Sequence, residues 1–71
     1  MRMFKAGDTV RVRSDSNSTY RGRTGAIQQE LPEDPRGYWY LVRFESDDLK
    51  ATIRVVEQDL SLVSHRKPAE E

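Results

Sequence analysis

The stretch that decides the fold reads YWYLVRF and runs from Tyr38 to Phe44. Aromatic and β-branched residues in such density are typical of a β-strand. Side chains alternate between the two faces of a strand. The face that we expect to fill the core carries Tyr40, Val42 and Phe44. The face that we expect to point outward carries Trp39, Leu41 and Arg43. The alternative is the reversed register, with Trp39 inside and Tyr40 outside.

Shorter strand patterns flank this stretch on both sides. They cover Thr9–Arg13, a strand through Ile27 to about Glu30, Lys50–Val56 and Ser61–Val63. Turn or loop signals separate them at Lys5–Asp8, Ser14–Thr19, Leu31–Gly37 and Glu45–Asp48. We assign residues 31–37 to a loop because two prolines cannot sit in a central strand. A single helical turn, Glu57–Asp59, precedes the last strand.

Several short strands joined by turns predict an all-β fold. We expect a small five-stranded barrel with one short helical turn before the last strand, because closure removes exposed strand edges. The barrel would occupy residues 1–63, and residues 64–71 would form a disordered polar tail. Between the first two strands, Gly22 and Gly25 predict a tight turn with one or both residues at positive φ.

Length and composition exclude several classes of function. The chain has 71 residues, no cysteine, and 12 basic against 12 acidic side chains. So small a domain has little room for both a core and an enclosed substrate pocket, so we do not expect an enzyme. Without cysteine it has no disulfide, thiol nucleophile or thiolate metal site. No apolar run approaches the roughly 18 residues of a membrane helix, and we expect a cytoplasmic protein with no membrane contact.

The zero net charge divides unevenly along the chain. Residues 1–27 carry six basic and two acidic side chains, and residues 28–71 carry six basic and ten acidic ones. The halves therefore have formal charges of +4 and −4. Such asymmetry indicates either an interaction surface or halves that pair with each other after folding.

Three segments together resemble a known family of small barrels. They are Gly7-Asp8-Thr9-Val10-Arg11-Val12, Tyr20-Arg21-Gly22-Arg23-Thr24-Gly25-Ala26-Ile27 and Tyr40-Leu41-Val42-Arg43-Phe44. They resemble the Src-homology-3-like barrel at the end of the nitrile hydratase β subunit, and more distantly KOW-motif proteins. Similar barrels are accessory subunits of photosystem I and of ferredoxin–thioredoxin reductase. The resemblance implies the fold and a role as a docking or accessory module. The nitrile hydratase activity is not implied, because its metal-binding thiolates belong to the other subunit.

The outward face of the central strand is the first candidate site. An exposed Trp and Leu beside an arginine have the composition of an interface anchor. The predicted protein-docking residues are Trp39, Leu41, Arg43, Arg11 and Arg13. The alternative is structural, with the proline-containing loop or the tail covering Trp39 and Leu41. Tyr20 and Tyr38 offer a weaker candidate for a peptide groove or, alternatively, cover one end of the barrel.

A cluster of arginines is the second candidate site. Arg11, Arg13, Arg21 and Arg23 lie on the first strand and around the Gly22 turn, where guanidinium groups can bind phosphates or carboxylates. They can equally pair with acidic residues of neighbouring strands. RNA binding is the alternative function, although an isoelectric point of about 6.6 is low for a nucleic-acid-binding protein.

No catalytic or metal site is expected. His65 is the single histidine and lies in the polar tail with no nucleophile nearby. Asp47-Asp48 and Glu33-Asp34 supply too few ligands at ordered spacing for calcium. We expect no cofactor and no small-molecule substrate. The sequence therefore predicts a non-catalytic module, monomeric or weakly oligomeric, that docks on a protein, with a KOW-like RNA- or ribosome-associated module as the alternative.

Overall fold

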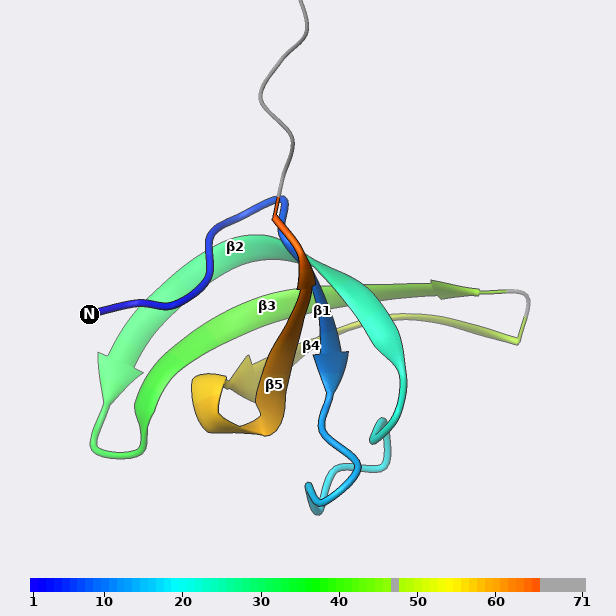
Figure 1. Ribbon diagram of the computed structural model, residues 1–71, viewed down its shortest axis with the longest axis horizontal. Helices are drawn as coiled ribbons and strands as arrows, with labels where there is room; N and C mark the ends of the chain where they lie inside the picture. Colours follow the sequence, from blue (N-terminus) through cyan, green and yellow to red (C-terminus); the bar gives the residue numbers. More distant parts are fainter. Residues whose placement is uncertain (47, 66–71) are drawn as a thin grey trace, which may run out of the picture.

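The computed structural model describes residues 1–46 and 48–65 and is all-β (Figure 1). Five strands form one antiparallel sheet in the order β4-β3-β2-β1-β5. The strands are β1 (Thr9–Val12), β2 (Thr24–Asp34), β3 (Gly37–Ser46), β4 (Leu49–Val56) and β5 (Leu60–Ser64). A 3₁₀-helix, η1 (Glu57–Asp59), precedes β5. The predicted all-β class and the helical turn before the last strand are confirmed.

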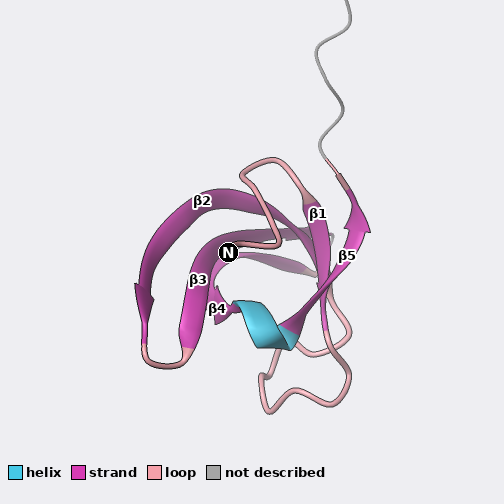
Figure 2. Cartoon of the chain, turned by 60° about the vertical axis from the view of Figure 1, so that its left-hand side comes forward, coloured by secondary structure: helices cyan, strands magenta, loops and turns pink. Residues whose placement is uncertain are grey.

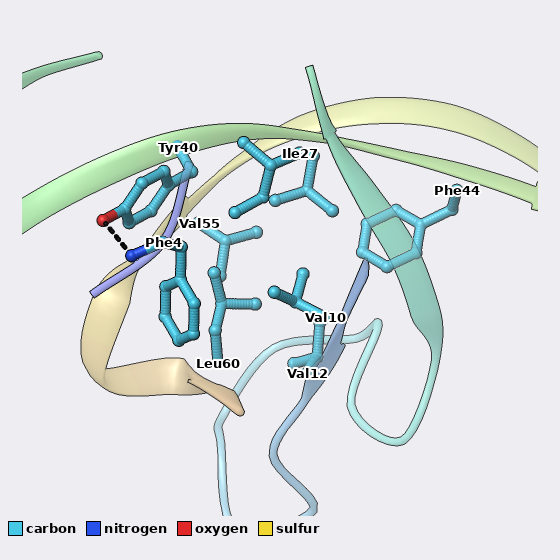
Figure 3. Packing of buried hydrophobic residues seen from close by; sticks show 9 residues of the cluster. Phe4, Val10, Val12, Ile27, Tyr40, Phe44, Val55 and Leu60 are labelled. Carbon is cyan, nitrogen blue, oxygen red and sulfur yellow. Dashed lines mark hydrogen bonds between the residues drawn. The ribbon is translucent and has the colours of Figure 1, made fainter. Parts of the chain in front are cut away.

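The predicted register of β3 is confirmed. The side chains of Tyr40, Val42 and Phe44 are buried in the core. On the opposite face Trp39 and Leu41 are half-buried and Arg43 is exposed. Figure 3 shows the core, to which β1, β2, β4 and β5 contribute Val10, Val12, Ile27, Val55 and Leu60.

The second strand is longer than the sequence predicts. The loop expected at Leu31–Gly37 shrinks to Pro35 and Arg36, because β2 continues through Pro32 to Asp34. Two features make the proline tolerable. Pairing with β3 is interrupted between Leu31 and Asp34, and β1 pairs with β2 only as far as Ala26. At Pro32 the strand is therefore an edge with a bulge, where a missing N–H costs no ladder hydrogen bond.

The sheet curves around the core without closing (Figure 2). Its end strands are β4 and β5, and η1 joins them. Within residues 1–46 and 48–65, no backbone pairing links these two strands. The predicted closed barrel is therefore not confirmed. The last strand extends one residue beyond the expected boundary, since Ser64 pairs with Thr9, and residues 66–71 of the expected tail lie outside the described part.

An N-terminal segment, residues 1–4, lies across the concave side of the sheet. Phe4 is buried and packs edge-on against the ring of Tyr40, with ring centroids 5.6 Å apart. The Arg2 guanidinium donates hydrogen bonds to the carbonyl oxygens of Trp39 and Leu31. It also lies over the Tyr38 and Tyr40 rings. The sequence pattern did not predict that residues 1–4 pack against the sheet.

Candidate functional site

The outer face of the sheet carries the predicted docking residues of β3. Cross-strand partners extend this surface, because residues opposite each other in a ladder project from the same face. On β4, Arg54 is opposite Leu41 and Thr52 is opposite Arg43. On β2, Leu31 is opposite Trp39. Arg11 projects from the same face of β1, opposite Thr24.

Trp39 is flanked by two arginines. The guanidinium carbon of Arg54 lies 4.8 Å from the Trp39 ring centroid, and that of Arg36, at the β2–β3 turn, lies 5.9 Å away. Both distances are within the range of cation–π attraction. Arg36 belongs to the segment that we expected as a proline-containing loop, so this segment covers part of Trp39, as the structural alternative proposed. The Trp39 ring remains half-buried rather than enclosed.

The indole N–H of Trp39 is buried next to Asp34. The proximity of this N–H is the main reason why the pKa of the Asp34 carboxyl is below its usual value. Its nitrogen nevertheless makes no hydrogen bond of normal distance and angle within the described part of the chain. The Asp34 carboxylate accepts the backbone N–H of Arg36 at 2.9 Å, which shapes the tip of the β2–β3 hairpin. The Trp39 ring is thus held at the base of this turn.

A hollow of about 460 Å³ lies beside Trp39. Its walls come from the β1–β2 loop, the β2–β3 turn, β3, and the consecutive segments β4 and η1. The charged and aromatic residues that line it are Asp15, Arg36, Trp39, Arg54 and Asp59. The volume falls within the range of ligand-binding sites, and the walls combine an aromatic surface with charges of both signs.

The two predicted docking arginines of the first strand do not line this hollow and lie in a neighbouring depression. Arg13 makes two hydrogen bonds of 3.0 Å with the Asp15 carboxylate, which lower the pKa of Asp15. Arg11 donates a long bond of 3.4 Å to the Thr24 hydroxyl. Arg11, Arg13 and Asp15 share a second depression, and Asp15 borders both. Arg13 is therefore connected to the hollow through Asp15.

Arg43 lies apart from the hollow. Its guanidinium pairs with Glu45 at 3.0 Å on the same strand, toward the β3–β4 hairpin. Of the five predicted docking residues, Trp39 lines the hollow, Arg13 and Arg11 border it through Asp15, and Leu41 and Arg43 continue the outer face along β3.

The four arginines of the predicted cluster do not form one patch of free charge. Arg23 binds Asp48 through two hydrogen bonds of 3.0 and 3.1 Å, which hold the pKa of Asp48 well below its usual range. Arg13 is neutralised by Asp15. Arg21 donates to the Ser18 carbonyl oxygen. Of these four arginines, Arg11 and Arg21 are without a carboxylate partner within residues 1–46 and 48–65.

Ion pairs also explain the charge asymmetry between the halves. Arg23 with Asp48, and Arg2 with Glu30 at 3.4 Å, each join the basic first half to the acidic second half. These two pairs are consistent with the interpretation that the basic and acidic halves pair with each other after folding.

The remaining candidates from the sequence are His65 and the acidic pairs. His65 is 69% exposed, with its Nδ1 3.5 Å from an Asp8 carboxylate oxygen. In the described part, no three His, Cys, Asp or Glu side chains come close enough to hold a metal ion. Asp47, one half of an acidic pair considered above, lies outside this part. No described helix has the length and apolar character needed to span a membrane.

Two residues at the hollow were not singled out from the sequence. Arg54 shares the outward face of its strand with Thr52, and the strand pattern places it there. Its position opposite Leu41 depends on the β3–β4 register. The position of Arg36 beside Trp39 could not be predicted from the sequence. It depends on the two-residue turn between β2 and β3, whereas the prolines indicated a longer loop.

The fold and the site together define a small all-β domain whose outer face bears a half-buried tryptophan between two arginines. No protein-family model matches the chain, and no curated protein matches it significantly.

Proposed function

We propose that this chain is a non-catalytic interaction module of the Src-homology-3-like class that docks on a protein partner or serves as an accessory subunit. The strand order, the curvature of the sheet and η1 before β5 support the assignment to this class. The docking surface comprises Trp39 with its hollow, Leu41 and Arg43 along β3, and Arg11 and Arg13 at the border.

The position of Trp39 is the single observation that carries this proposal. Tryptophan and arginine are enriched among the residues that dominate binding energies at protein interfaces. Trp39 is half-buried on the outer face, beside a hollow wide enough for side chains of a partner. Because neighbouring arginines hold the ring in place, little conformational entropy is lost when a partner covers it.

The test is capture of a partner by the immobilised domain from a lysate of its source cells. We expect Trp39→Ala to abolish capture, while circular dichroism shows the fold retained, since Trp39 lies outside the core cluster. Arg21→Gln is the control, because Arg21 lines a different depression with Phe44 and Glu45. Equal capture by the Trp39→Ala variant and the unaltered domain would contradict the proposal.

RNA binding is the second candidate function, favoured by Arg11 and Arg21, which lack carboxylate partners among the described residues. Counterion release makes such binding fall steeply as salt rises. Fluorescence anisotropy with labelled polyuridine at increasing salt measures this. Arg21→Gln should weaken RNA binding and Trp39→Ala should leave it unchanged. Salt-insensitive binding, or no binding at low salt, would remove this candidate.

A further inference from the structure

The hollow beside Trp39 contains two exposed cations, and neither forms an ion pair among the described residues. Arg36 and Arg54 are both exposed, and their guanidinium groups form no ion pair or hydrogen bond within the described part of the chain. We propose that the segment that docks at Trp39 is an acidic peptide whose carboxylates bind to Arg36 and Arg54. This inference rests on the proposed docking function and specifies the partner's chemistry.

The position of each guanidinium over the Trp39 ring leaves both arginines able to bind carboxylates. A guanidinium that lies over an aromatic ring uses its face, and its N–H donors remain at the edge in a planar fork. That fork matches the two oxygens of a carboxylate, and such bidentate hydrogen bonds are among the strongest in proteins. Since Trp39 already restrains Arg36 and Arg54, a ligand carboxylate meets donors whose freedom is partly lost before binding.

The acidic residues around the hollow form no ion pair with these arginines. Asp15 is bound by Arg13, and Asp59 also lies near Arg13, whose pKa both carboxylates raise. Asp34 accepts the backbone N–H of Arg36 and lies beside the Trp39 indole; the charge of Arg36 contributes least among the causes that lower the pKa of Asp34.

The rest of the outer face is also favourable to an acidic ligand. Along β3, the Arg43 charge is balanced by Glu45, and Glu45 is opposite Lys50. Arg54 is opposite the uncharged Leu41. Uncompensated positive charge on this face therefore includes Arg36 and Arg54 around Trp39, where an acidic peptide finds complementary charge next to an apolar surface, and also Arg11 on β1.

The spacing of the arginines fits an extended peptide. Because their guanidinium carbons lie 5.9 and 4.8 Å from one ring centroid, they are no more than 10.7 Å apart. Side chains on one face of an extended chain repeat about every 7 Å. Two carboxylates on alternate residues can thus reach both arginines at once.

The test is titration with a peptide of alternating Glu and Thr residues, followed by the fluorescence of Trp39, the single tryptophan of the chain. The control peptide has Gln in place of Glu. We expect the Glu peptide to change Trp39 fluorescence saturably and the Gln peptide to bind far more weakly. Arg54→Gln and Arg36→Gln should each lower affinity about tenfold, and Arg21→Gln should leave it unchanged.

The outcomes separate this inference from the docking function on which it rests. Equal binding of the Glu and Gln peptides, no binding of either, or unchanged affinity in Arg54→Gln would overturn the acidic ligand. Loss of polyuridine binding in Arg36→Gln and Arg54→Gln, with no response to the Glu peptide, would assign the site to RNA instead. If Trp39→Ala abolishes capture of the partner but the two Gln variants retain it, docking stands and the acidic partner is wrong.

Discussion

At the scale of single residues, Tyr40 connects the core to the 3₁₀-helix. Its ring is fully buried, and its hydroxyl donates a 2.7 Å hydrogen bond to Glu57. The same hydroxyl accepts the Phe4 backbone N–H at 3.4 Å (Figure 3). Burial of the ring, and secondarily Glu57, raises the pKa of Tyr40. The neutral phenol is thus the form that the folded protein requires.

Tyr40→Phe should lower the free energy of unfolding by about 1 kcal/mol at neutral pH, because the Phe4 N–H and Glu57 lose a partner. The raised pKa also sets a pH dependence. The neutral Tyr40 phenol contributes fully to the free energy of unfolding below the pKa of tyrosine in the unfolded chain, about 10. This contribution is lost as the pH rises through the higher pKa of Tyr40 in the folded protein. Urea unfolding from neutral to alkaline pH should therefore show a decline above about pH 10 that Tyr40→Phe reduces. Tyr38→Phe is the control, and an equal effect of both substitutions would contradict this role.

At the scale of elements, the start of β2 contains a glycine that is required for a reason other than the one that the sequence suggests. Gly22 just before β2 and Gly25 near its start predict positive φ at one or both positions. Gly22 has a φ of +83°, whereas Gly25 is not at positive φ. Gly25 is required for space, since a Cβ there would lie 2.7 Å from the Arg43 carbonyl oxygen and 2.9 Å from the Phe44 ring. Sequence could place a glycine in this region but could not say that β3 lies against it.

Gly25→Ala should destabilise the domain by about 2 kcal/mol, because the backbone of β3 has to move away from the new methyl group. Gly22→Ala is the matched control. It meets nothing within 4 Å, so it should cost only about 1 kcal/mol of backbone strain. Thermal or urea unfolding of both variants measures the difference, and a larger loss at Gly22 would show that this close approach is unimportant.

At the scale of the whole molecule, the N-terminal segment completes the core that the open sheet leaves accessible. Phe4 is 2% exposed although it lies outside every strand. The Met3 backbone N–H donates to Glu57 at 2.9 Å, so the segment also holds η1. Interactions that close the concave side therefore link the beginning of the chain to β3 and to η1.

Phe4→Ala should reduce the free energy of unfolding by about 3 kcal/mol, because it leaves a cavity between Tyr40 and Leu60 in the core cluster. Met3→Ala is the control. The Met3 side chain is 68% exposed and its hydrogen bond uses the backbone, so this substitution should be nearly neutral. Similar stability of the two variants in urea unfolding would show that the N-terminal segment is not part of the core.

The sequence by itself determined the local features of this protein. Alternation along Tyr38–Phe44 separates a face with Tyr40 from a face with Trp39, and the structure shows that the Tyr40 face is buried, as we expected. The turn signals separate five strands and one helical turn. These features depend on neighbouring residues, whose side chains follow a fixed period of two. Only the tertiary structure decided that Arg36 and Arg54 meet at Trp39, that Pro32 lies in a strand, and that Phe4 fills the core. These depend on strand pairing and sheet curvature, which bring distant segments together and leave no periodic signal in the chain.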